Sequence, residues 1–169
     1  MARSIGNELP AAIVSLLAAD PLPDQADADG LDLTILVLTT TPDGWPHLAM
    51  VSLGEIIAVG PRALRLALWP NSTAARNLWR EQRMTLALVH DEAAYSVRCA
   101  ARRGADLVLP ANGGQLACFG LRVDDVVEDV PPDATLTGGV RFRLHNPDTT
   151  MRRWQQTRAA LRAARFSGG

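Results

Sequence analysis

The stretch PNSTAARNL, residues 70–78, has the composition of a helix start that can receive an anion. Asn71 and Ser72 are residues that cap helices, and the free amides of a first helical turn attract negative charge. Strong phosphate sites add charge-assisted hydrogen bonds from Lys or Arg, whereas Thr73 and Ala74 stand beside the serine here. The stretch therefore predicts a weakened anion site, or a cap whose donors are satisfied by its own side chain and water.

Other reactive arrangements are not indicated. His47, His90 and His145 stand singly, without the spacing of zinc ligands. No serine lies in a nucleophile elbow, no GxGxxG opens a helix, and the absence of Lys excludes a Schiff-base or P-loop lysine. Asp124 and Asp125 are neighbours on a predicted strand, so their side chains point to opposite faces. No catalytic residue and no metal site are assigned.

An Arg-rich segment, RRWQQTRAALRAAR (152–165), lies near the end of the sequence. Met151, Trp154 and Leu161 recur at helical spacing and predict a narrow apolar stripe. The favoured interpretation is a docked terminal helix whose arginines face solvent, and the alternative is contact with an acidic ligand or a partner subunit. Nucleic-acid binding is not supported, because the net charge is −1 and only 5% of residues are aromatic.

Composition indicates a globular protein. The chain has 169 residues, 47% apolar and 21% charged, which is within the usual size of one domain. Cys99 and Cys118 lie in apolar runs and are expected to be buried thiols, which favours a cytoplasmic location. The run AAIVSLLAA only faintly resembles a signal peptide, because Glu8 and Pro10 interrupt it. No apolar run approaches the roughly 20 residues of a membrane-spanning helix, so no membrane contact is expected.

The pattern of the chain predicts a mainly β protein with peripheral helices. Antiparallel strands spaced by roughly 8 to 12 residues favour a barrel or sandwich. We expect strands at 33–40, 47–59 (bent at Gly54), 63–69, 84–90, 94–103, 116–130 (bulged at Gly120) and 140–145, and helices at 10–19, from Asn71 or Ser72 to 82, and from Pro147, capped by Asn146, to 165. The chain is read as one domain: an N-terminal helix and acidic loop (1–32, with the loop at 20–32), a barrel (33–145) and the Arg-rich helix (146–169).

Three segments, taken in order, resemble a known family. They are LVLTTTPDGWPHLAMVSLGEI, LRLALWPNSTAARNLWREQRMTLALVHDEAAYSVRCAARR and LACFGLRVDDVVEDV. Together they resemble the FMN-binding split β-barrel of the pyridoxamine 5'-phosphate oxidase-like flavoproteins, from about Leu33 to Val130. The resemblance is strongest in STAARNLWREQRMTLAL. It implies a six-stranded antiparallel split β-barrel with a terminal helix, and a homodimer that binds one FMN at each of two sites in the subunit interface.

The resemblance also implies where the flavin lies. The places of the family's phosphate-binding cations fall on Ala49, Gly54, Thr73 and Ala74, none of which is charged. Arg98 and Arg102 could compensate if their strand face meets the phosphate, and Arg76 is either turned toward the phosphate or on the surface. The expected cofactor-binding residues are Ala49, Met50, Val51, Ser52, Leu68, Trp69, Ser72, Thr73 and Arg76.

The implied function is an FMN-binding flavoprotein with a redox role and no named substrate. Pyridoxamine-phosphate oxidation itself is disfavoured, because its substrate phosphate also needs cations. Two alternatives stay open: a split-barrel dimer that has lost flavin and acts as a binding or regulatory module, and the same fold using deazaflavin or haem. The expected ligand is a flavin or another phosphate-bearing small molecule.

Overall fold

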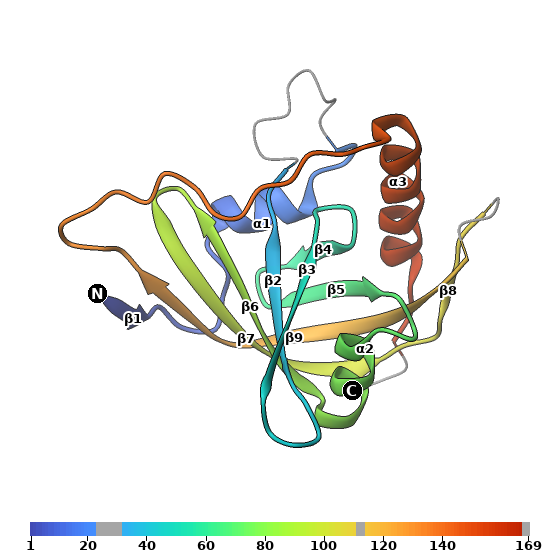
Figure 1. Cartoon of the computed structure of the whole chain (residues 1–169), viewed down its shortest axis with the longest axis horizontal. Helices are drawn as coiled ribbons and strands as arrows, with labels where there is room; N and C mark the ends of the chain where they lie inside the picture. Colours follow the sequence, from blue (N-terminus) through green and yellow to red (C-terminus); the bar gives the residue numbers. More distant parts are fainter. Residues whose placement is uncertain (23–31, 111–113, 167–169) are drawn as a thin grey trace.

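The computed structural model describes residues 1–22, 32–110 and 114–166, which form a strongly curved antiparallel sheet with three helices packed around it (Figure 1). No helix within these ranges is long and apolar enough to span a membrane. The elements are β1 (Ala2–Ser4), α1 (Ala11–Ala18), β2 (Ile35–Thr40), β3 (Pro46–Val51), β4 (Ile56–Gly60), β5 (Ala63–Leu68), α2 (Thr73–Glu81), β6 (Arg83–His90), β7 (Ala93–Arg103), β8 (Leu107–Val108), β9 (Gln115–Asp129) and α3 (Pro147–Ala163).

The sheet runs in the order β3-β2-β6-β7-β9-β5-β4, and every neighbouring pair is antiparallel. The short strands β1 and β8 also pair with β9. Curvature brings the two ends of this path toward each other, yet β3 and β4 are not paired, so the barrel is split rather than closed. The predicted class, mainly antiparallel β with a terminal helix, is confirmed, although the path has seven strands and not six.

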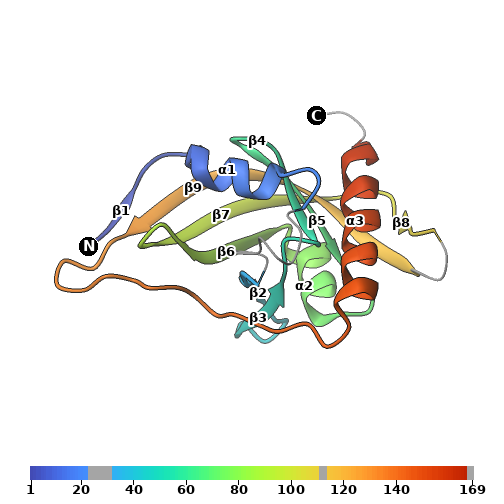
Figure 2. The same ribbon diagram turned by 90° about the horizontal axis from the view of Figure 1, so that it is seen from above.

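Two expected strands differ in the structure. The run over residues 47–59 is divided into β3 and β4 by a turn in which the Glu55 amide donates to the Ser52 carbonyl. The run over residues 140–145 forms only an isolated bridge between Arg141 and Leu33. The segment between β9 and α3 crosses the molecule to reach α3 instead of adding a strand (Figure 2).

Smaller corrections concern the loops and the bulge. The register of β7 and β9 shifts between Arg98 and Cys99, where Asp124 of β9 is left unpaired, whereas Gly120 is paired regularly on both sides. Asn146 makes no side-chain cap hydrogen bond at the start of α3. The strands β1 and β8 were not expected. Of the predicted acidic loop, residues 23–31 lie outside the described residues.

Helices close the open parts of the sheet. Helix α1 packs against β4, α2 against β2, and α3 against β4 and β5. Alternation along β5 places Leu64 and Leu66 in the core, and both cysteines are buried, as expected. Burial raises the pKa of the Cys99 thiol to about 12 and that of Cys118 to about 11. Both thiols are therefore protonated at neutral pH and act as apolar core groups.

Arg158 fastens α3 to the rest of the molecule. Its side chain is 1% exposed and lies on the buried side of the Arg-rich helix. The sequence pattern instead predicted that the arginines of this helix face solvent. The guanidinium donates to four backbone carbonyls, those of Leu53, Ile56, Leu17 and Ala19. Burial lowers the pKa of Arg158 to about 10, so the group remains charged at neutral pH. One cation thereby joins α3, the end of α1 and the turn between β3 and β4.

We predict that Arg158→Met lowers the free energy of unfolding by about 3 kcal/mol or more, because it leaves several buried carbonyls without donors. Urea unfolding followed by circular dichroism measures the change. Arg152→Met, on the exposed side of the same helix, is the matched control and should stay within about 0.5 kcal/mol of the original protein. Equal stability of the two variants would contradict the anchoring role.

Candidate functional site

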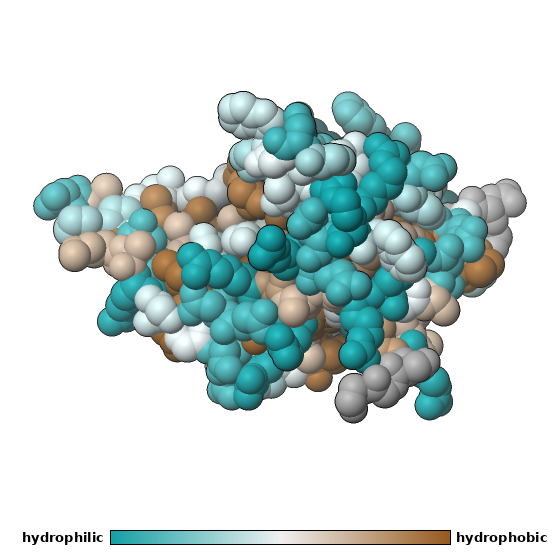
Figure 3. Space-filling view, turned by 90° about the horizontal axis from the view of Figure 1, so that it is seen from below, coloured by the Kyte–Doolittle hydropathy of each residue, from teal (hydrophilic) through white to brown (hydrophobic). Residues whose placement is uncertain are grey.

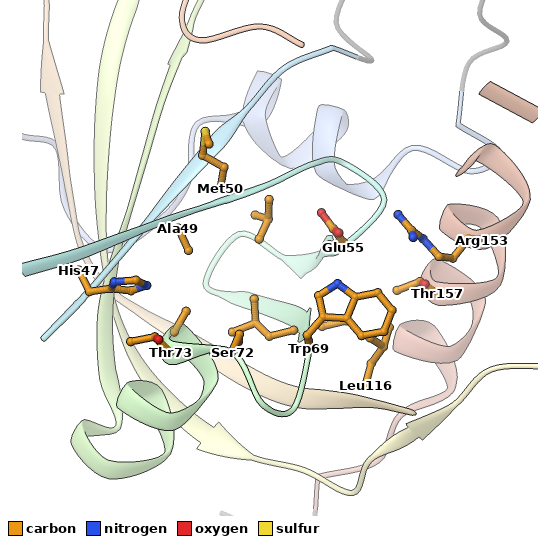
Figure 4. A pocket seen from close by; sticks show the side chains of 14 residues that line it. His47, Ala49, Met50, Glu55, Trp69, Ser72, Thr73, Leu116, Arg153 and Thr157 are labelled. Atoms are coloured by element: carbon orange, nitrogen blue, oxygen red, sulfur yellow. The ribbon is translucent and has the colours of Figure 1, made fainter. Parts of the chain in front are cut away.

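A cavity of about 260 Å³ lies between β3, the end of β5, the start of α2 and the outer turns of α3 (Figure 4). Most of its lining is apolar, with polar groups from α2 on one side and from α3 on the other. Seven of the nine residues expected to bind the cofactor line it: Ala49, Met50, Val51, Leu68, Trp69, Ser72 and Thr73. Elements distant in the sequence therefore converge on the place that the resemblance indicated.

The start of α2 supplies the hydrogen-bond donors of one side. Ser72 is the N-cap, and its Oγ accepts from the Ala75 amide at 3.2 Å. Within the described residues the amides of Thr73 and Ala74 have no acceptor. The hydroxyl hydrogens of Ser72 and Thr73 are also not donated to any described residue. These groups, with the positive end of the helix, can receive an anion.

Two expected residues do not line the cavity. Arg76 turns back toward the start of α2, where it donates to the Asn71 carbonyl (2.6 Å) and to Thr73 Oγ1 (3.2 Å). The Arg76 guanidinium therefore lies outside the cavity and contacts Thr73, which does line it. Ser52 is buried beside the cavity and donates through its amide and hydroxyl to Glu55 Oε2, at 2.7 and 2.9 Å. Ser52 thus positions a lining carboxylate rather than a ligand.

The structure explains one of the missing cations. A Cβ atom at Gly54 would lie 1.9 Å from Cγ of Trp154, so no side chain fits there while α3 is docked. Trp154 is 3% exposed and packs edge-on against Phe142. Ala49, Thr73 and Ala74 line the cavity, although the small side chain of Ala74 is only 1% exposed. At residue 54, where the resemblance implies a family cation, docked α3 leaves no space for a side chain.

Arg98 and Arg102 do not compensate for this loss. Arg98 pairs with Asp125 at 3.3 Å and lines a separate hollow beside β2. Arg102 lines another hollow, on the outer face of β5, β9 and β7. Neither arginine lines the cavity, so the condition under which they could compensate is not met within this chain.

Sequence reasoning missed a different cation, Arg153. Its guanidinium carbon lies 6.0 Å from the centre of the Trp69 ring, and the side chain lines the cavity from α3. Thr157, one helical turn later, lines the same wall. The interpretation of the Arg-rich helix as a contact for an acidic ligand pointed toward this helix, but nothing in the sequence distinguished Arg153 from its neighbours. His47 and Glu55 were likewise not assigned to the site.

The chain is similar to known proteins in both sequence and structure. No protein-family model matches it. YclD, an uncharacterised protein of Bacillus subtilis, is 37% identical over 123 residues, which are 70% of this chain and 76% of YclD. A crystal structure from Lactobacillus delbrueckii, provisionally assigned as a pyridoxamine 5'-phosphate oxidase, superposes with a TM-score of 0.54 at 16% identity, covering 73% of this chain and 98% of that one.

The chain belongs to one family with YclD, and it has the split-barrel fold of the Lactobacillus delbrueckii structure. The family resemblance seen in the sequence is thereby confirmed. An FMN-binding protein from Syntrophomonas wolfei has 13% identity to this chain and a TM-score of 0.44, with 70% of this chain and 84% of that protein covered.

We predict that Gly54→Ala destabilises this split barrel by about 2–3 kcal/mol, because the added methyl group overpacks the contact with Trp154. Gly60→Ala is the matched control, since a Cβ at Gly60 meets nothing within 4 Å, and it should change stability by less than about 1 kcal/mol. Thermal unfolding of both variants checks the difference. If both melt together with the original protein, α3 does not exclude a side chain at residue 54.

Proposed function

We propose that this split barrel binds FMN in the cavity and has a redox role. The observation that carries the proposal is the convergence of the predicted flavin-lining residues of β3 and β5 with the start of α2. When bound, FMN supplies the electron-transfer chemistry, and the protein positions it. No substrate is named, and pyridoxamine-phosphate oxidation stays disfavoured for want of cations. The cytoplasmic location stays a prediction.

The donor set supports a phosphate-bearing ligand, held weakly. At the α2 side, the free amides of Thr73 and Ala74 and the hydroxyls of Ser72 and Thr73 are available to a phosphate. The apolar surfaces of Val51, Leu68 and Leu116, together with the half-exposed Trp69, are available to an aromatic ring system. In this proposal these residues bind and orient the flavin and exclude water from one of its faces.

One observation favours the flavin-free alternative. The places of the family cations are uncharged, and each hydrogen bond to a charged group contributes roughly 1.5–3 kcal/mol. Losing two of them weakens binding by several decades, since about 1.4 kcal/mol is one decade. A split-barrel dimer acting as a binding or regulatory module is therefore the second candidate. The absorbance spectrum of the purified protein, with mass analysis of any released ligand, distinguishes flavin, deazaflavin, haem and no cofactor.

We predict that FMN binds measurably and that Thr73→Arg tightens it roughly tenfold, because an added guanidinium at the cavity forms charge-assisted bonds to phosphate. Riboflavin, which lacks the phosphate, should gain nothing. Flavin fluorescence during titration measures both ligands. Ala159→Arg, which adds the same charge on an exposed part of α3 outside the cavity, is the matched control. If FMN binds neither the original protein nor the Thr73→Arg variant, although both are folded, the flavin proposal is wrong.

We also propose that the protein is a homodimer in which β3 is covered by the partner. β3 is an edge strand of the sheet path, and its outward side chains Leu48 and Met50 are 51% and 63% exposed. Trp45, at the adjoining turn, is exposed as well. Figure 3, a view of the molecule from below, shows separate hydrophobic patches within a mainly hydrophilic face. Met50 also lines the cavity, so a partner on β3 would adjoin the ligand.

Light scattering at micromolar concentration should give twice the 18.2 kDa mass of the chain. Leu48→Asp should shift the protein toward the monomer, because it places a charge in an apolar interface. Val59→Asp, at an exposed position of β4 outside the β2–β3 hairpin, is the control and should leave the mass unchanged. A monomer mass for the original protein would contradict the dimer.

A further inference from the structure

The α3 side of the cavity carries two ionic side chains, Arg153 and Glu55. In Figure 4 they lie toward the side of Trp69 and Thr157, whereas His47 and Thr73 lie on the side of α2. Both are half-buried, and they form no ion pair with each other. The cavity therefore has two chemically different sides. The start of α2 offers hydrogen-bond donors and no carboxylate, whereas the side near α3 carries the Arg153 guanidinium and the Glu55 carboxylate.

Arg153 has hydrogen-bonding capacity that the protein does not use. Within the described part of the chain it makes no ion pair or hydrogen bond, and its guanidinium lies over the face of the Trp69 ring. A guanidinium held against an aromatic ring keeps its planar set of donors directed outward at the edge. These donors are available to an acceptor in the cavity.

Glu55 offers the complementary acceptor. Its Oε2 accepts from the amide and hydroxyl of Ser52, which fixes the carboxylate in the turn between β3 and β4. Its Oε1 has no donor among the described residues. A carboxylate beside the cavity repels a second anion, so a phosphate is disfavoured on this side. A group that presents an N–H is favoured there.

We propose that Arg153 and Glu55 together recognise the imide edge of the ring of the ligand, an N–H flanked by carbonyls, as a flavin presents on its pyrimidine ring. Arg153 donates to a ring carbonyl, and the ring N–H donates to Glu55 Oε1. This inference rests on the proposed flavin function and assigns the orientation of the ligand: ring edge toward α3, phosphate toward α2. It makes Arg153 and Glu55 specificity residues of the site.

The test compares three ligands: FMN, riboflavin, and N3-methylriboflavin, which lacks the imide N–H. Arg153→Met keeps a long apolar side chain over Trp69 and removes the donors. It should weaken FMN and riboflavin by the same factor, roughly 10- to 100-fold, as expected for a hydrogen bond to a charged group. Arg152→Met, at the neighbouring exposed position of α3, should leave all three affinities unchanged. The original protein should bind N3-methylriboflavin at least roughly tenfold more weakly than riboflavin.

Glu55→Gln completes the design. Its amide oxygen can stay with the Ser52 donors, which turns an NH₂ toward the ligand. The Glu55→Gln variant should then bind riboflavin and its N3-methyl analogue with about equal affinity. Near-ultraviolet circular dichroism confirms that each variant is folded, and the comparison of the ligands on the original protein needs no variant at all.

Each alternative outcome has a definite meaning. If Arg153→Met weakens FMN but not riboflavin, Arg153 holds the phosphate and the proposed orientation is overturned. Equal binding of riboflavin and N3-methylriboflavin to the original protein also overturns it, while the flavin function stands. If neither FMN nor riboflavin binds the folded original protein, the flavin function itself fails and the inference fails with it.

Discussion

The buried guanidinium of Arg158 is the constraint on which the arrangement of the site depends. A charged group is stable out of water only when hydrogen bonds offset its lost hydration, and here Nη1 and Nη2 donate to carbonyls at the end of α1 and around the turn between β3 and β4. Those carbonyls are at element ends, where the backbone has no partner within its own helix or strand. Helix α3 therefore cannot slide or rotate without leaving a buried charge unpaired. Its position fixes everything that projects from it.

Two consequences follow from that position of α3. Trp154 is pressed onto Gly54, which requires a residue without a side chain there. Arg153, on the neighbouring side of the helix, reaches the cavity beside Trp69. Docked α3 thus leaves no room for a cationic side chain at residue 54, and it brings a cation of its own, Arg153, to the cavity. The same docking that stabilises the split barrel also changes the charge distribution of its cavity.

Local sequence pattern determines some elements of this fold, and tertiary packing determines others. Alternation in β5 and the capping serine of α2 are local signals, and both appear in the structure as the residues predict. The runs at 47–59 and 140–145 also carry apolar patterns, yet one is broken by a turn and the other is left as a crossing segment. A strand needs a partner edge as well as a pattern, and that edge is a property of the assembled sheet.

The sequence by itself determined the mainly antiparallel β class and a helix cap at Asn71 or Ser72, because these depend on local periodicity and on order along the chain. The resemblance to a family, also read from the sequence, indicated seven residues that line the cavity. Only the tertiary structure decided the roles of the arginines. Residues 152, 153 and 158 are alike in sequence, but one faces solvent, one lines the cavity and one is buried among carbonyls. The reason is geometric: helical rotation sends neighbours to different faces, and which face meets the cavity depends on contacts with residues more than 100 positions away.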